Sequence, residues 1–220
     1  MRGFCFAMVM LGLAGGAAAA PLLRTADFIP NAARTGFSGF EGSVPFPGSD
    51  AIHMEGGITT QTVNGVAWTG FVNWGGEGNR AWYHDGGSFG FTRITTADGS
   101  DFQDIGFLIG HGNGGTFARY VYDLRLNGAP VLFGTLDGTN GQYLGFSGGG
   151  FDEVRVIGAG TAFASGLVGL RDVSGGSSQA VAIDSIEVRV TAVTVPEPSS
   201  LVILAAGLLG LRLARRRPRT

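Results

Sequence analysis

The sequence predicts an all-β protein, an antiparallel β-sandwich of jelly-roll-like form, flanked by two segments that serve export. Apolar and polar residues alternate with a period of two through the central part of the chain, and no long stretch there has the helical period of 3.6. Glycine-containing turn dipeptides separate these runs every 8 to 12 residues or so. Glycine makes up 40 of the 220 residues without a collagen-like period, and 44% of the residues are hydrophobic, which excludes a disordered chain.

Residues 1–19 have the composition of a secretory signal peptide. Arg2 supplies a positive charge, an apolar run extends from residue 5 to residue 14, and small residues follow it. Because Pro21 is a poor residue directly after a cleaved bond, we expect signal peptidase to cut after Ala19. Cys5 lies in the removed segment, so the mature protein is expected to have no disulfide framework and no thiol chemistry.

The β-sandwich domain is expected to span residues 20–194. Its clearest strand covers residues 116–126, and Asn127-Gly128 then supplies the positive φ angles of a two-residue hairpin, with residues 130–136 as the returning strand. Asn64-Gly65 predicts a second hairpin, between residues 58–63 and 66–74. Further strands are expected at residues 80–84, 89–94, 102–109, 142–146, 154–157, 162–171 and 179–193, with turns at Asp98-Gly99, Asp137-Gly138 and Asn140-Gly141.

The last predicted strand contains a change of phase. Two apolar residues before Asp184 and three after Ser185 follow opposite phases of the alternation; they are Val181, Ile183, Ile186, Val188 and Val190. Such a change requires one extra residue, which predicts a β-bulge at Asp184-Ser185. The order of the strands within the sheets does not follow from these patterns.

Residues 195–220 form a second processing segment. Pro196, Glu197 and Pro198 break any strand, an apolar run covers residues 201–211, and five arginines follow it. A helix over residues 199–214 would be about 24 Å long at ~1.5 Å per residue, which is short for a hydrocarbon core of about 30 Å. The arginines predict a cytoplasmic C-terminus and a main domain on the other side of the membrane.

This tail resembles the PEP-CTERM sorting signal of Gram-negative bacteria, which combines a Pro-Glu-Pro motif, a hydrophobic helix and a terminal arginine cluster. The resemblance covers residues 195–220 and implies recognition by an exosortase, a membrane transpeptidase that cuts near the motif. A processed protein keeps no spanning helix, and the alternative is an ordinary C-terminal anchor that persists. Residues 182–186 also look similar to a late segment of jelly-roll sandwiches found among PEP-CTERM proteins.

The central domain is acidic. It contains nine arginines against sixteen aspartates and glutamates, for a net charge near −7, whereas the whole chain carries −2. An acidic surface repels phosphates, so nucleic acid is not an expected partner.

Two glycine-rich motifs match cofactor or catalytic signatures by letter only. Residues 110–115 fit a dinucleotide-binding pattern, but a strand and not a helix is expected after them. Ser147 lies in a G-x-S-x-G match, yet no histidine follows it in the chain. His53, His84 and His111 lie in separate segments without the spacing of metal ligands. These observations predict a noncatalytic protein.

Aspartates form a candidate structural calcium site. Asp98, Asp101 and Asp104 bring three carboxylates to a tight turn, and calcium prefers six to eight oxygen ligands. Asp184, at the predicted bulge, resembles the late-strand aspartate that completes a calcium site in some carbohydrate-binding jelly rolls. The alternative is that aspartates in turns bond their own backbone.

Four aromatic residues form a candidate glycan-binding platform. Trp68, Trp74, Trp82 and Tyr83 lie within 16 residues and alternate with polar side chains. Sugars pack their C–H faces on aromatic rings, which favours binding of polysaccharide. The alternative is that these rings belong to the core. If one ring is exposed, Trp74 is the first choice and Trp82 the second.

The sequence therefore predicts an exported, noncatalytic protein of the cell surface or biofilm matrix. Its partners would be signal peptidase, an exosortase, extracellular polysaccharide and, before processing, the inner membrane. One alternative is a secreted polysaccharide hydrolase, which needs two carboxylates about 5 to 9.5 Å apart across a cleft. Another is a passive coat component without a ligand, which buried tryptophan rings would favour.

Overall fold

The described part of the chain is a sandwich of two antiparallel β-sheets, as predicted. The computed structural model describes residues 20–43, 47–71, 77–85, 90–111, 118–159 and 181–190. Every strand pair within these ranges is antiparallel. The jelly-roll form of the sandwich stays a prediction.

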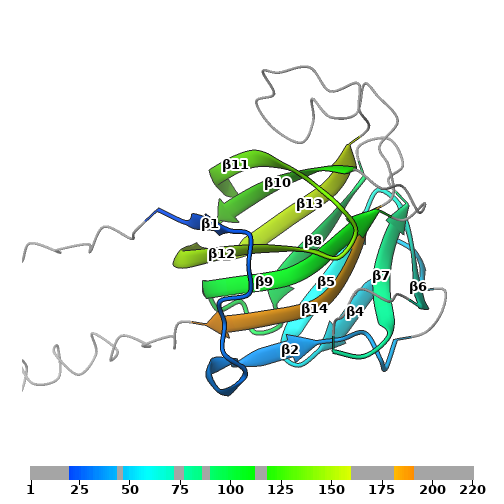
Figure 1. The fold of residues 1–220 in the computed structure, drawn as a ribbon, viewed down its shortest axis with the longest axis horizontal. Coiled ribbons are helices and arrows are strands. Elements are labelled where there is room, and N and C mark those ends of the chain that lie inside the picture. Colours follow the sequence, from blue (N-terminus) through cyan, green and yellow to red (C-terminus); the bar gives the residue numbers. More distant parts are fainter. Residues whose placement is uncertain are drawn as a thin grey trace, which may run out of the picture. The chain divides into compact units, whose positions relative to one another are not determined.

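The larger sheet has the strand order β1-β12-β9-β14-β7-β6-β3 in this part of the chain, and β2 pairs with β14 in addition. Figure 1 shows β12, β9 and β14 running side by side, with β2 next to β14. The strands are β1 (Leu22–Arg24), β2 (Gly36–Ser38), β3 (Gly48–Ser49), β6 (Val66–Phe71), β7 (Arg80–Asp85), β9 (Phe102–His111), β12 (Gln142–Phe151) and β14 (Val181–Val190).

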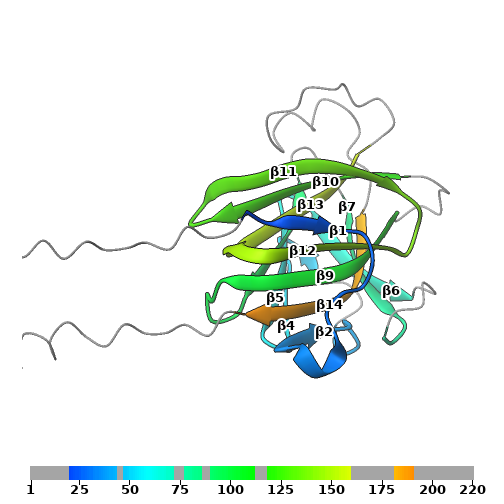
Figure 2. The same cartoon turned by 60° about the vertical axis from the view of Figure 1, so that its left-hand side comes forward.

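The smaller sheet has the order β11-β10-β13-β8-β5-β4. Figure 2 shows β11 at the outer end of this sheet, next to β10. Its strands are β4 (Ile52–Glu55), β5 (Ile58–Val63), β8 (Phe91–Thr96), β10 (Ala118–Leu126), β11 (Ala129–Gly138) and β13 (Glu153–Ala159). A short 3-10 helix, η1 (Asn31–Ala33), lies between β1 and β2.

The core lies between the two sheets and is built from the inward phase of each strand. In β10, Tyr120, Tyr122 and Leu124 point inward, as the alternation predicts. The larger sheet contributes several phenylalanines to the same cluster: Phe102, Phe107, Phe146 and Phe151. The paired inner faces exclude water from these side chains, which is the main stabilising contribution in a sandwich of this kind.

One part of the interior carries polar side chains. Thr62 of β5 and Thr92 of β8 lie directly opposite each other and are fully buried. His84 enters from β7 of the other sheet, and a Cβ atom at Gly90 would lie only 2.9 Å from its Nε2. Within the described residues, neither threonine hydroxyl and neither ring nitrogen of His84 has a hydrogen-bond partner.

The hairpin at Asn127-Gly128 is confirmed. It joins β10 to β11, and both residues have positive φ angles, 51° and 79°, as a primed turn requires. The bulge in the last strand is also confirmed, because the register of β14 against β9 shifts between Asp184 and Glu187, and Ser185 has a φ of 50°.

The prediction of a hairpin at Asn64-Gly65 is wrong. These residues join β5 of the smaller sheet to β6 of the larger sheet, and the two strands do not pair. Asn64 has a positive φ of 55°, but the turn is directed by Asp50, which accepts a hydrogen bond from the Asn64 N–H at 2.8 Å. The dipeptide therefore lies in a turn that leads the chain from one sheet to the other. Asp50, which binds this turn, lies between β3, which pairs with β6, and β4, which pairs with β5.

Several other boundaries differ from the prediction. Asp137-Gly138 continues β11 and is not a turn, since Asp137 pairs with Arg119 of β10. The short strands β1 to β4 were not predicted, because they contain too few residues to show an alternation. The expected strand at residues 162–171, the signal peptide at 1–19 and the tail at 195–220 lie outside the described residues.

Candidate functional site

A stacked pair of rings lies on the outer face of the larger sheet. Trp68 of β6 and Tyr83 of β7 are direct neighbours in the register, with ring centroids 5.8 Å apart and ring planes at 4°. Both side chains are partly exposed. Gly70 makes room for Tyr83, because a Cβ at this position would lie 3.2 Å from Cε2 of the tyrosine ring. The glycine thus lets the ring lie close to the backbone of β6.

Phe71 ends β6 three residues after Trp68, so the alternation directs its side chain toward the other face of the sheet. Its side chain is 78% exposed, and the guanidinium of Arg80 lies 5.7 Å from its ring centroid. The Tyr83 hydroxyl donates a long hydrogen bond of 3.5 Å to the Phe71 carbonyl. We call Trp68 and Tyr83 the aromatic patch. Phe71 and Arg80 pair in the opposite phase of the two strands and do not belong to it.

The other two predicted platform residues are placed differently. Trp82 is fully buried and stacks with Phe40 at a centroid distance of 6.0 Å, so it belongs to the core, which was the alternative for this residue. Its neighbour Tyr83 is exposed because successive residues of a strand face opposite sides of the sheet. Trp74 lies outside the described residues.

A pocket of about 270 Å³ lies on the outer face of the larger sheet, near the bulge of β14. Arg34 binds two carboxylates there: its Nε and Nη2 lie 2.7 Å from Oε2 of Glu187, and its Nη1 binds Oε1 of Glu77. The Tyr143 hydroxyl donates to Oε1 of Glu187 at 2.5 Å. Asp27 also lines the pocket. Three acids, one arginine and one phenol therefore converge at this place.

Two glycines of the sheet make this arrangement possible. A Cβ at Gly106 of β9 would lie 1.7 Å from the Tyr143 hydroxyl oxygen, and one at Gly145 would lie 2.9 Å from the same ring. Tyr143 therefore crosses β9 above a bare backbone to reach β14. Phe28, from the N-terminal segment, packs edge to face against the Tyr143 ring at a centroid distance of 6.2 Å.

Burial changes the protonation of this network. Burial raises the pKa of the Glu187 carboxyl, although Tyr143 and Arg34 act in the opposite direction. Burial and the neighbouring carboxylate of Glu187 raise the pKa of Tyr143. The phenol thus stays protonated as a donor, and Arg34 supplies the positive charge that a buried carboxylate needs.

Asp184 is fully buried beside this pocket. One of its carboxylate oxygens accepts a hydrogen bond from the Ser185 N–H at 2.6 Å, and the other has no partner within the part of the chain that the structure describes. Burial, with a smaller contribution from the charge of Glu41, raises the pKa of Asp184 to about 6 against the hydrogen bonds from Ser185. A carboxyl group in this setting binds its proton more tightly than an exposed aspartate.

The four aspartates of the candidate calcium site are dispersed. Asp98 accepts a hydrogen bond from the Ser100 N–H at 3.0 Å in an exposed turn, and Asp101 is exposed. Asp104 of β9 is bound by Arg189 of β14, whereas Asp184 lies opposite Leu108, four residues further along β9 or roughly 13 Å away. Among the described residues, no group of three or more His, Cys, Asp or Glu could hold a metal ion.

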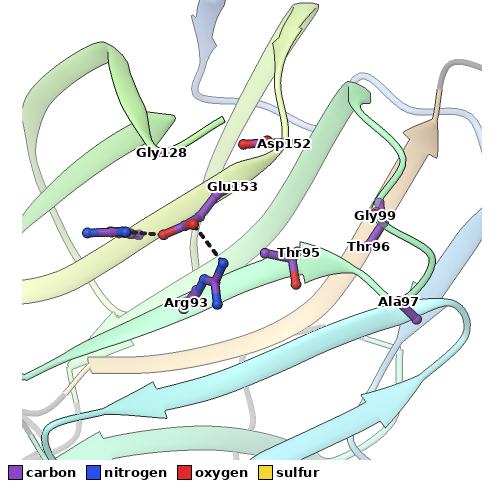
Figure 3. A pocket seen from close by; sticks show the side chains of 9 residues that line it. Arg93, Thr95, Thr96, Ala97, Gly99, Gly128, Asp152 and Glu153 are labelled. Carbon is purple, nitrogen blue, oxygen red and sulfur yellow. Dashed lines mark hydrogen bonds and ion pairs between the residues drawn. The ribbon is translucent and has the colours of Figure 1, made fainter. Parts of the chain in front are cut away.

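A second, open pocket of about 550 Å³ lies on the smaller sheet. Figure 3 shows Arg93 of β8 and Glu153 of β13 turned toward each other, and Asp152 and Gly128 also line the pocket. Glu153 is almost fully buried and binds both Arg93, at 2.9 Å, and Arg155. The two arginines lower the pKa of Glu153 against the effect of burial. Both carboxylate oxygens of Glu153 are thus already paired with arginines within the protein.

The residues of the letter-only motifs lie in strands. Ser147 is in β12 and its hydroxyl accepts a hydrogen bond from Nε of Arg24, which belongs to β1. His53 of β4 contacts Glu55 at 3.4 Å. Within residues 110–115, only 110 and 111 are described, at the end of β9.

Sequence reasoning did not identify Arg34, Tyr143 or Glu187 as a group. The last strand did contain a signal, because the charged residues Asp184, Glu187 and Arg189 interrupt an apolar run and must face outward. The partners of Glu187 and Arg189 come from segments more than 40 residues away, so the sequence pattern could not name them.

Comparison with known proteins identifies the tail. The family model of the PEP-CTERM protein-sorting motif matches residues 194–217, and no curated protein matches the chain. Within the residues described by the structure, no helix is long and apolar enough to span a membrane. The motif implies export, a membrane-anchored intermediate and processing by an exosortase. The chain is thus an exported protein that carries a PEP-CTERM sorting motif.

Proposed function

We propose that this exported protein is a noncatalytic component of the cell surface or biofilm matrix, and that it contacts polysaccharide through the aromatic patch. The observation that carries the proposal is the stacked, partly exposed pair of Trp68 and Tyr83. Rings held side by side on a rigid sheet offer a hydrocarbon surface for the C–H faces of sugar units without a large loss of conformational entropy on binding.

The polar surroundings of the patch support the same proposal. The Tyr83 hydroxyl makes a long hydrogen bond of 3.5 Å, to the Phe71 carbonyl. Hydroxyl groups of a sugar need donors and acceptors next to the ring on which it packs. A tyrosine hydroxyl can both donate and accept such hydrogen bonds.

The state of the carboxylates favours a noncatalytic role. Glu153 in the second pocket binds two arginines, which lower its pKa. An acid or base in glycoside hydrolysis needs a proton that moves between enzyme and substrate, which a carboxylate held in this way does not readily accept. Hydrolysis remains the alternative function, tested by release of reducing ends from secreted polysaccharide.

Binding of the exported protein to immobilised secreted polysaccharide and to a glycan array tests the proposal. We expect Trp68→Ala and Tyr83→Ala to weaken binding by about tenfold or more, since each removes an aromatic contact. Phe91→Ala is the matched control, because this partly exposed ring lies on the other sheet under Arg155. Absence of binding by the folded wild-type protein, or equal loss in the Phe91 variant, would contradict the proposal and favour a passive coat role.

A further inference from the structure

The strand β11 is a long edge. It pairs with β10 on one side and ends the smaller sheet, as Figures 1 and 2 show. Within the described ranges no strand pairs with its other side, and none of its ten residues is buried. In an antiparallel edge strand, every second residue directs its N–H and C=O groups away from the sheet. This strand therefore presents a row of backbone groups that another strand can bind.

The remaining described edges are much shorter. β3 has two residues, β1 has three and β4 has four, so each can form only a few hydrogen bonds with a neighbour. Natural proteins protect their edges with short strands, inward-facing charges and prolines. β11 has one proline, Pro130 near its start, and one charged residue, Asp137 near its end.

That single charge is already neutralised within the same protein molecule. Arg119 of β10 binds the Asp137 carboxylate with two hydrogen bonds, at 2.5 and 2.9 Å. The middle of β11, from Val131 to Leu136, contains no charged side chain. Nothing in this stretch repels a second strand of the same sequence, although the domain as a whole is strongly acidic.

Both faces of β11 can continue into an added strand. Leu132 and Leu136 are partly buried and pack against the core, and Val131, Phe133 and Thr135 alternate with them on the outer face. A strand paired along this edge would cover the exposed parts of Leu132 and Leu136 on the inner face. On the outer face it would place its own side chains next to Val131, Phe133 and Thr135.

We propose that β11 joins two copies of this chain by antiparallel pairing about a two-fold axis, independently of any binding of polysaccharide. Within the described part of the protein, β11 is the longest strand at the end of a sheet, so β11 of a second copy matches this edge in length. Two registers are considered. When Phe133 lies on the two-fold axis, Asp137 faces Ala129 of the second copy. When Gly134 lies on the axis, Asp137 faces Val131 of the second copy. Neither register opposes two acids. The closed two-fold symmetry limits the assembly to a dimer. The sorting motif, by directing every copy to one membrane, raises the local concentration that weak pairing needs.

Sedimentation velocity of the exported protein over a range of concentrations tests this interface. We expect a concentration-dependent dimer. The double variant Phe133→Lys/Thr135→Lys places like charges opposite each other in both registers, and should weaken association by about tenfold or more. The matched control is Ile52→Lys/Met54→Lys on β4, the opposite edge of the same sheet, where the side chains are 57% and 63% exposed. This control should dimerise like the wild type.

Two results would overturn the proposal. One is a wild-type protein that stays monomeric at every concentration tested. The other is dimerisation that survives charge on β11 but is lost with charge on β4. Circular dichroism and the urea midpoint establish that each variant is folded. If the double variant does not fold, Phe133→Lys alone tests the register with Phe133 on the axis, where it places like charges opposite each other. An equimolar mixture of Phe133→Lys and Thr135→Lys tests the register with Gly134 on the axis.

Discussion

Tyr143 donates its hydroxyl hydrogen bond to Glu187 at 2.5 Å, across a strand that separates β12 from β14. The contact passes over Gly106, where any side chain would occupy the position of the phenol oxygen. The same carboxylate binds Arg34 from the segment that follows β1. One buried acid thus links the N-terminal segment to two strands of the sheet.

Because the Tyr143 ring lies over Gly106, substitutions at these two positions should have coupled effects on stability. We expect Gly106→Ala to lower the free energy of unfolding by about 1 to 3 kcal/mol, because the new methyl group displaces the Tyr143 ring. Tyr143→Phe should lower it by about 1 to 2 kcal/mol through the lost hydrogen bond to Glu187. Urea denaturation of both variants and the double variant should show less than additive effects. Gly42→Ala, where no atom lies within 4 Å of the new Cβ, is the near-neutral control.

His84 predicts a loss of stability in acid. Burial lowers the pKa of His84 to about 4, so the unfolded chain binds this proton more readily between about pH 6.5 and pH 4. Its contribution is therefore present at pH 7 and is lost as the pH falls through this window, by at most about 1.4 kcal/mol per pH unit. Comparing unfolding free energies of wild type and His84→Gln at several pH values isolates this part. Parallel pH profiles for the two proteins would contradict the prediction.

Asp184 predicts the opposite sign over nearly the same window. Burial raises its pKa to about 6, so the folded protein binds this proton more tightly than the unfolded chain. Ionisation of Asp184 thus destabilises the fold as the pH rises from about 4 to 7. We expect Asp184→Asn to gain up to about 3 kcal/mol relative to wild type between pH 4 and pH 7. An unchanged difference between the two proteins at both pH values would argue against this assignment.

The threonines inside the sandwich predict a stabilising substitution. Thr62 and Thr92 are buried side by side, and their hydroxyls have no hydrogen-bond partner among the described residues. Valine has nearly the same shape and no polar atom to desolvate. We expect Thr62→Val/Thr92→Val to raise the free energy of unfolding by about 1 to 2 kcal/mol in urea denaturation. A decrease would show that the hydroxyls make favourable contacts.

The two described tryptophans should differ in their effect on stability. We expect Trp82→Ala to lower the free energy of unfolding by about 3 to 5 kcal/mol, because it opens a large cavity in the core. Trp68→Ala should cost only about 1 kcal/mol, since its ring is partly exposed. Thermal unfolding followed by near-UV circular dichroism measures both. Similar losses in the two variants would place Trp68 in the core as well.

Several elements could be predicted from sequence because their causes are local. The alternation in residues 118–126, the Asn127-Gly128 turn and the phase change at Ser185 each depend on a few neighbouring residues. The failure at Asn64-Gly65 has the same origin. The dipeptide does predict a turn, but whether the next strand pairs with the previous one depends on Asp50 and on the sheet that each strand joins.

The β-sandwich class, the inward and outward phases of the longer strands and the sorting motif at residues 194–217 could be predicted from the amino-acid sequence, since each depends on contiguous residues. The exposure of each ring, the strands that form edges and the residues that contact Glu187 became known from the three-dimensional arrangement. These properties arise from pairing between segments far apart in the chain, and one residue of register is enough to turn a side chain such as Tyr83 from the core to the surface.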